Sequence, residues 1–116
     1  MYFGPIQTSE KPLWSFRHGF AGTVDLVIRD TLGLIILDLK THKPKNKTNP
    51  AYPEDLLQVA GYDLALHDME GVAQMKAHHT ILVACADGTF YEDHRYIPPE
   101  AFLDVLSVYR TMKEVA

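Results

Sequence analysis

Two aspartates and a lysine stand inside apolar segments of strand length. Asp25 lies within the run GTVDLVIR, and Asp38 and Lys40 lie within LGLIILDLKT. An ionised side chain in a buried strand is costly unless it is paired, hydrogen-bonded or bound to a metal. On an exposed strand, Asp38 and Lys40 would form only a surface ion pair worth ~0–1 kcal/mol. The three charges together favour a functional site over a surface pair.

The two segments have the pattern of a β-hairpin. If its turn centres between Thr31 and Leu32, Asp25 and Asp38 face each other across the two strands. Lys40 shares their face, because side chains alternate with period two along a strand. A bulge near one of the flanking glycines would shift this register by one residue.

Facing carboxylates at positions 25 and 38 predict a cation site. Two such groups repel and raise each other's proton affinity unless a cation lies between them. Mg²⁺ suits the position, because it takes oxygen ligands, keeps several waters and accepts phosphate oxygens. Mn²⁺ is expected to substitute for it.

The rest of the chain supplies the elements that must hold these residues. Hydrophobic periodicity and turn residues predict strands at Leu13–His18, 22–29, 32–41, 80–86 and within 87–97, and helices from Pro53 to about Leu66 and from Pro99 onward. The segment HKPKNKTNPAYP between the third strand and the first helix is a polar loop. The third strand is apolar on both faces, which predicts a central place in the sheet. The order βββαββα indicates an α/β fold, a mixed sheet flanked by helices, with no helix expected upstream of the first strand.

Composition restricts the class of protein. The chain has 116 residues, of which 47% are hydrophobic and 22% charged, as in one ordinary globular domain spanning 1–116. No apolar run approaches the roughly 20 residues of a membrane span, and the first residues lack the basic region followed by an apolar region that is typical of a signal peptide. We therefore expect a cytoplasmic protein, or one in the host cytoplasm if it is viral. Cys85 is the single cysteine, which argues against an iron–sulfur cluster.

Three motifs resemble the PD-(D/E)XK nuclease superfamily, most closely its RecB-like branch with the phage-type exonucleases. They are FAGTVDLV, IILDLKT and LLQVAGYDLAL, in the order and on the elements typical of that superfamily. The resemblance implies a restriction-endonuclease-like core and a Mg²⁺-dependent deoxyribonuclease. It implies these site residues: Asp25 and Asp38 as metal ligands, Leu39 as a ligand through its backbone carbonyl, Lys40 as the catalytic lysine, and Gln58 and Tyr62 as the accessory motif.

Gln58 and Tyr62 are four residues apart, so a helix places them on one face. Both side chains can hydrogen-bond a nucleotide or the lysine of the site. Lys43, Lys45 and Lys47 follow the second charged strand in the polar loop. They are either a solvated charge run or contacts to the phosphate backbone of DNA, which supply most sequence-independent affinity for nucleic acid.

One expected part of a RecB-like site is missing. Such nucleases carry an upstream helix with a His or Glu that completes the metal site, and here Glu10 and His18 are the available stand-ins. Otherwise the site is minimal, or the chain is a fragment or reduced version and a partner subunit or a second copy of the chain completes the site. The leading hypothesis is an exonuclease in recombination, repair or phage DNA processing. An endonuclease of the restriction or junction-cleaving kind and a catalytically silent binding or assembly module stay open as alternatives.

Overall fold

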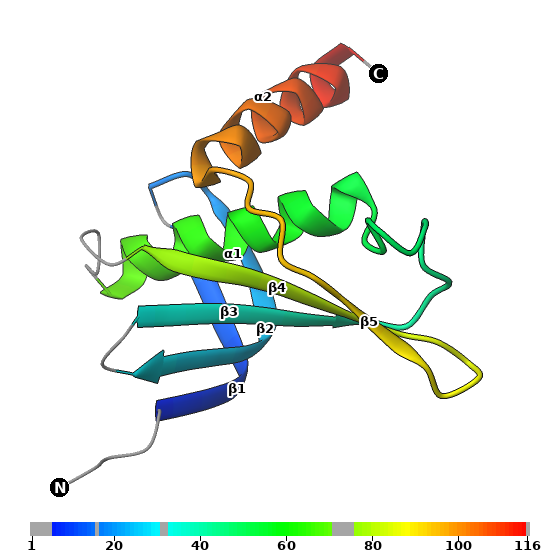
Figure 1. The fold of residues 1–116 in the computed structure, drawn as a ribbon. Helices are drawn as coiled ribbons and strands as arrows, with labels where there is room; N and C mark the ends of the chain where they lie inside the picture. Colours follow the sequence, from blue (N-terminus) through cyan, green and yellow to red (C-terminus); the bar gives the residue numbers. More distant parts are fainter. Residues whose placement is uncertain (1–5, 16, 31–32, 71–75, 116) are drawn as a thin grey trace, which may run out of the picture.

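The computed structural model describes residues 6–15, 17–30, 33–70 and 76–115 (Figure 1). The elements follow one another as β1 (Ile6–Ser15), β2 (Phe20–Asp30), β3 (Gly33–Lys40), α1 (Pro53–Glu70), β4 (Ala77–Ala84), β5 (Phe90–Asp93) and α2 (Pro99–Val115). This order confirms the predicted succession of strands and helices. The predicted turn residues 31–32 lie outside the described residues.

The five strands form one mixed sheet in the order β1-β2-β3-β4-β5. Strands β3 and β4 are parallel, and the other neighbours are antiparallel. The predicted central place of β3 is confirmed, because it lies third of five. Helix α1 connects β3 to β4 across one face of the sheet, and α2 lies on the side of α1 away from the sheet (Figure 1). Neither helix in the described part of the chain is long and apolar enough to span a membrane.

The first strand differs from the prediction. It runs from Ile6 to Ser15 rather than from Leu13 to His18. Strand β1 is at the edge of the sheet, where a proline such as Pro12 can turn its missing N–H donor away from the neighbouring strand. Helix α1 also continues past the predicted end at Leu66, to Glu70. The local signals therefore predicted the elements better than their ends.

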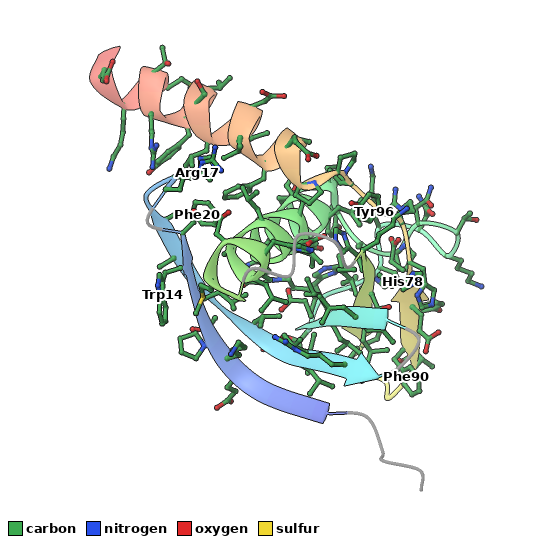
Figure 2. All side chains as sticks on the ribbon, turned by 90° about the vertical axis from the view of Figure 1, so that its left-hand side faces the viewer. Trp14, Arg17, Phe20, His78, Phe90 and Tyr96 are labelled. Carbon is green, nitrogen blue, oxygen red and sulfur yellow. The ribbon has the colours of Figure 1, made fainter. Side chains whose placement is uncertain are left out.

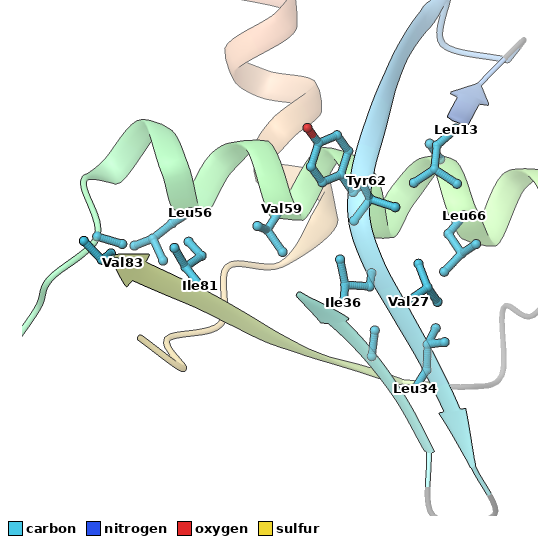
Figure 3. Packing of buried hydrophobic residues seen from close by; sticks show 14 residues of the cluster. Leu13, Val27, Leu34, Ile36, Leu56, Val59, Tyr62, Leu66, Ile81 and Val83 are labelled. Carbon is cyan, nitrogen blue, oxygen red and sulfur yellow. The ribbon is translucent and has the colours of Figure 1, made fainter. Parts of the chain in front are cut away.

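Helix α1 packs its apolar side on the sheet. Val59 and Leu66 of α1, Leu34 and Ile36 of β3 and Ile81 of β4 are almost fully buried in one cluster (Figure 3). Burying a side chain of this size contributes about 1.5–3 kcal/mol. Because side chains alternate along β3, the same face that carries Leu34 and Ile36 also carries the side chain two residues further on, which is Asp38.

The β1–β2 ribbon bends at Glu10 and Asp25. Its ladder of paired residues is interrupted at these two facing positions and resumes in the same register on both sides. Glu10 has a φ of 48°, which is rare for a residue other than glycine. Val24 and Val27 are both in the core although they are three apart, so the alternation of β2 shifts between them. Figure 2 shows the ribbon curving from the sheet toward α2. Asp25 thus lies at the bend itself.

Candidate active site

The β2–β3 hairpin has the register that the sequence predicts. Leu26 pairs with Leu37, which makes Asp25 and Asp38 the next facing positions. Their carboxyl groups are within hydrogen-bonding reach of each other. The two aspartates therefore lie together at the end of the hairpin ladder, where β2 bends away.

The side chain of Asp25 forms a hydrogen bond to β3 just beyond the last residue pair of the β2–β3 ladder. Its Oδ2 accepts a hydrogen bond of 2.7 Å from the backbone N–H of Leu39. In an extended strand the N–H and the C=O of one residue point to the same neighbouring strand. The carbonyl of Leu39 therefore also points toward the side on which Asp25 lies, as its predicted role as a metal ligand requires.

Asp38 is the buried member of the pair, with 3% of its surface exposed. Burial and the hydrogen-bonding contact with Asp25 raise the pKa of Asp38 to about 6, although the neighbouring Lys40 opposes the shift. The Nζ of Lys40 lies 3.0 Å from Oδ2 of Asp38. That buried oxygen nevertheless lacks a well-directed hydrogen bond. It is a carboxylate oxygen with the capacity to accept one more partner.

A chain of polar contacts leads from these carboxylates to α1. The ammonium of Lys40 donates a hydrogen bond to Oε1 of Gln58. The Gln58 side chain in turn hydrogen-bonds the hydroxyl of Tyr62, one turn further along the helix. Burial, together with the charges of Asp38 and Asp25, raises the pKa of Tyr62 to about 12, so the hydroxyl keeps its proton. The structure thus brings together the five predicted catalytic residues.

Gly22 makes room for this arrangement. A Cβ atom at this position would lie 2.9 Å from Cε1 of the Tyr62 ring, closer than packed carbon atoms approach. Figure 3 shows the Tyr62 ring beside β2. The small residue near the start of β2, part of the motif FAGTVDLV, therefore has a steric reason: it admits the tyrosine of the accessory motif.

The donor set fits a hard divalent cation. It offers two adjacent carboxylates, one of which has a buried oxygen without a directed hydrogen bond, and a backbone carbonyl turned to the same side. Oxygen donors of this kind suit Mg²⁺ or Mn²⁺. Within the described ranges, no three His, Cys, Asp or Glu side chains form a metal-binding group. The site therefore offers two protein carboxylates.

The two stand-ins for an upstream acid do not join these carboxylates. The Nε2 of His18 lies 4.0 Å from Asp68, near the far end of α1. Glu10 is opposite Asp25 in the strand register, but its side chain is exposed. By its position in the sheet, opposite Asp25, Glu10 lies nearer to Asp25 and Asp38 than His18 does.

Three exposed lysines, Lys43, Lys45 and Lys47, lie on the loop that follows β3. The base of the loop is held by residues that the sequence analysis missed. The Nε2 of His42 lies 2.9 Å from Oδ2 of Asp55, and that oxygen also accepts a hydrogen bond of 3.0 Å from the backbone N–H of Tyr52. An acidic residue at the third position of a helix often reaches back in this way, so Asp55 could have been found from its spacing.

Comparison with known proteins assigns the chain to a family. A family model of the PD-(D/E)XK nuclease superfamily matches residues 3–96. A search of curated proteins found no significant match. Among 14 matching chains of solved structures is a crystal structure of SSO0001, with a TM-score of 0.58, 12% sequence identity and coverage of 91% of this chain and 50% of that one. At this identity the likeness shows the fold alone, and the chain spans half the length of that structure. The family match extends from β1 to the residues after β5 and includes the hairpin and α1, so the chain belongs to the PD-(D/E)XK nuclease superfamily.

Proposed function

We propose that the protein is a metal-dependent nuclease that hydrolyses DNA phosphodiester bonds, most closely a RecB-like exonuclease acting in recombination, repair or phage DNA processing. One observation carries the proposal. Asp38 is buried beside a second carboxylate, with an oxygen that lacks a directed hydrogen bond and with a lysine 3.0 Å away. A site that concentrates negative charge in this way gains stability from a divalent cation.

Each residue of the site has a separate role in the proposed hydrolysis of a phosphodiester bond. Asp25 and Asp38 would hold a divalent metal ion, with the carbonyl of Leu39 as a further ligand. Such an ion, when bound, neutralises the phosphate and lowers the pKa of a bound water. The ammonium of Lys40 is placed to orient the attacking water or to stabilise negative charge that develops on the phosphate.

Gln58 and Tyr62 act on the lysine rather than on the metal. Gln58 accepts a hydrogen bond from Lys40 and so restricts where the ammonium points. Tyr62 hydrogen-bonds Gln58 from within the protein and fixes that amide in turn. This accessory pair on α1, which follows the pattern of the RecB-like branch, supports the assignment to that branch.

The lysine loop favours a polyanionic substrate. Lys43, Lys45 and Lys47 are exposed and follow the strand that carries the site. Contacts from such lysines to phosphates would position DNA without reading its sequence. The net charge of −4 leaves this loop as a local basic region on an acidic protein.

The test uses end-labelled linear DNA and closed-circular DNA, incubated with the protein in Mg²⁺, in Mn²⁺ and in chelator. We expect metal-dependent loss of the linear substrate and survival of the circles. Cutting of circles would indicate an endonuclease with the same core. No reaction of either DNA in either metal would contradict catalysis and favour the silent binding module.

A further inference from the structure

A hollow opens directly beside the polar chain of the site. It measures about 160 Å³ and is lined mainly by apolar residues, among them Leu13, Phe20 and Phe102, and by two residues with polar side chains, Gln58 and Tyr62. One water needs only about 10–15 Å³ by this measure, and drug-sized pockets run to about 300–1,000 Å³. The hollow is therefore of a size for a single flat ring.

Aromatic residues form its walls, and glycines let two of these rings pack closely. The rings of Phe20 and Phe102 lie 4.7 Å apart between centroids, at 56° to each other. Gly22 and Gly61 line the hollow where the rings of Tyr62 and Phe102 pack against the backbone. A Cβ at Gly61 would lie 2.9 Å from the ring of Phe102, so this glycine lets α2 bring its phenylalanine against α1. Figure 2 shows Phe20 on β2 between that strand and α2.

Gln58 joins the hollow to the proposed catalytic centre. The same side chain lines the hollow and accepts a hydrogen bond from Lys40, which lies 3.0 Å from Asp38. A phosphate held at the carboxylates would therefore have its own nucleotide within reach of the hollow. Bases stack on aromatic side chains without regard to sequence, and this contributes about 1–3 kcal/mol per base in single-stranded complexes.

We propose that this hollow, defined by Phe20, Tyr62 and Phe102, receives the base of one nucleotide next to the scissile phosphate. The proposal rests on the nuclease function above and adds a base-stacking subsite to it. Phe20 is a specificity-determining residue in this assignment. It would favour substrates that present an unstacked base at that position, while the identity of the base would matter little.

The experiment compares short DNA oligonucleotides that are intact with ones that carry a single abasic nucleotide, moved stepwise along the chain. In Mg²⁺, wild type should cleave the substrate that is abasic at the subsite roughly 5- to 150-fold less efficiently, in kcat/KM, than the intact one. Phe20→Leu keeps an apolar side chain of similar size and should lose most of that ratio. Phe20→Tyr keeps the flat ring and should retain it.

Two controls separate stacking from general damage. Phe90→Leu makes the same chemical change at an exposed aromatic residue of β5 outside the hollow, and should leave the ratio at the wild-type value. A merely structural defect in Phe20→Leu would lower the rates on intact and abasic substrates alike. A fluorescent base analogue at the subsite position, with Ca²⁺ replacing Mg²⁺, should lose emission on binding wild type and keep it with Phe20→Leu.

The results distinguish failure of the subsite from failure of the proposed function. Equal cleavage of intact and abasic substrates by wild type would overturn the subsite and leave the nuclease intact. No cleavage of any substrate would overturn the nuclease function, and unchanged emission of the base analogue would then overturn the subsite as well.

Discussion

Two buried aspartates in one row of the sheet meet opposite surroundings. Asp38 on β3 and Asp93 on β5 both pair with Ile81 on the strand between them, and they are 3% and 4% exposed. Asp93 accepts hydrogen bonds from Arg95, at 2.7 Å from Nη2, and from the backbone N–H of Ala51, at 3.1 Å. Asp38 has the ammonium of Lys40 at 3.0 Å but also a second carboxylate, that of Asp25, beside it. Burial penalises both charges, and the neighbours decide the outcome.

The pKa values of the two groups shift in opposite directions. Burial raises the pKa of Asp38 to about 6, and Asp25 adds to the shift. Burial also opposes ionisation of Asp93, but the hydrogen bonds from Arg95 and Ala51 outweigh it and hold the pKa of Asp93 below its usual range. The hydrogen-bonded carboxylate of Asp93 therefore stabilises the fold. Ionisation of Asp38, in the absence of metal, instead lowers the free energy of unfolding at a position that serves the proposed function.

The sign of the pH dependence follows from these shifts. Without metal, the contribution of Asp38 to stability is fully present below its unfolded pKa of 3.8 and is lost as the pH rises through about 6. The contribution of Asp93 is present above 3.8 and is lost as the pH falls through its lower folded pKa. A metal ion bound by Asp25 and Asp38 would prevent the loss of stability that ionisation of Asp38 causes.

The largest expected effect concerns catalysis. Asp38→Ala and Lys40→Ala should each lower DNA cleavage by several orders of magnitude, because the carboxylate pair and the lysine act as one unit. The double variant should lose little more than either single one. Cleavage assays with circular dichroism as a folding check would test this. Asp104→Ala removes an exposed aspartate from α2 and should cleave as wild type does; near wild-type cleavage by either site variant would contradict the assignment.

Asp93→Ala should have the largest effect on stability. It leaves Arg95 and the N–H of Ala51 without their carboxylate, so we expect a loss of about 2–3 kcal/mol in the free energy of unfolding at pH 7. The difference from wild type should shrink as the pH falls below 3.8, where the aspartate of wild type begins to bind a proton. Urea unfolding at several pH values measures both. Equal stability at pH 7 would mean that the pairing contributes nothing.

Asp25→Asn should have a smaller effect of the opposite sign. It removes one of two repelling charges and keeps the shape of the side chain, so in chelator at pH 7 the variant should be more stable by about 1 kcal/mol, though inactive. Mg²⁺ or Mn²⁺ should raise the melting temperature of wild type and barely move that of the variant. A melting series with and without metal tests both. A variant that gains as much from metal as wild type would show that the aspartates do not share a cation.

Regular patterns made the fold and the register predictable. Alternation along the strands and a turn expected to centre between Thr31 and Leu32 predicted that Asp25 and Asp38 face each other, and the pairing of the described residues confirms that register. The irregular backbone at Glu10 could not be predicted in this way, because no local sequence signal indicates a positive φ at a glutamate. Next to it, the β2–β3 ladder ends at the pair Leu26–Leu37, and the N–H of Leu39 is bonded by the Asp25 side chain instead of by a strand backbone.

Hydrogen bonds between residues far apart in the sequence were also not predicted. The contacts of His42 with Asp55 and of Asp93 with Ala51 join segments 13 and 42 residues apart. A single sequence shows which residues are polar but not which loops meet, because these contacts depend on how the chain returns after each strand. The predicted roles of Asp25, Asp38, Lys40, Gln58 and Tyr62 stay predictions until the variants are measured.

The smallest expected effect concerns the lysine loop, where the site meets solvent. If Lys43, Lys45 and Lys47 contact phosphates, each change to alanine should weaken DNA binding to a similar degree for every sequence. The slope of log affinity against log salt should flatten by about 0.7–0.9 per lost contact, because each lysine releases counterions when it neutralises a phosphate. Binding isotherms at several salt concentrations measure this slope.

Lys113→Ala, on the exposed end of α2, is the matched control and should leave the slope unchanged. Because buried charges are screened far less than exposed ones, the same salt series should leave the stability difference between wild type and Asp93→Ala nearly constant. Slopes that do not change in any of the three loop variants would make the loop a solvated charge run and leave a metal ion held by the carboxylate pair as the proposed contact to the phosphate.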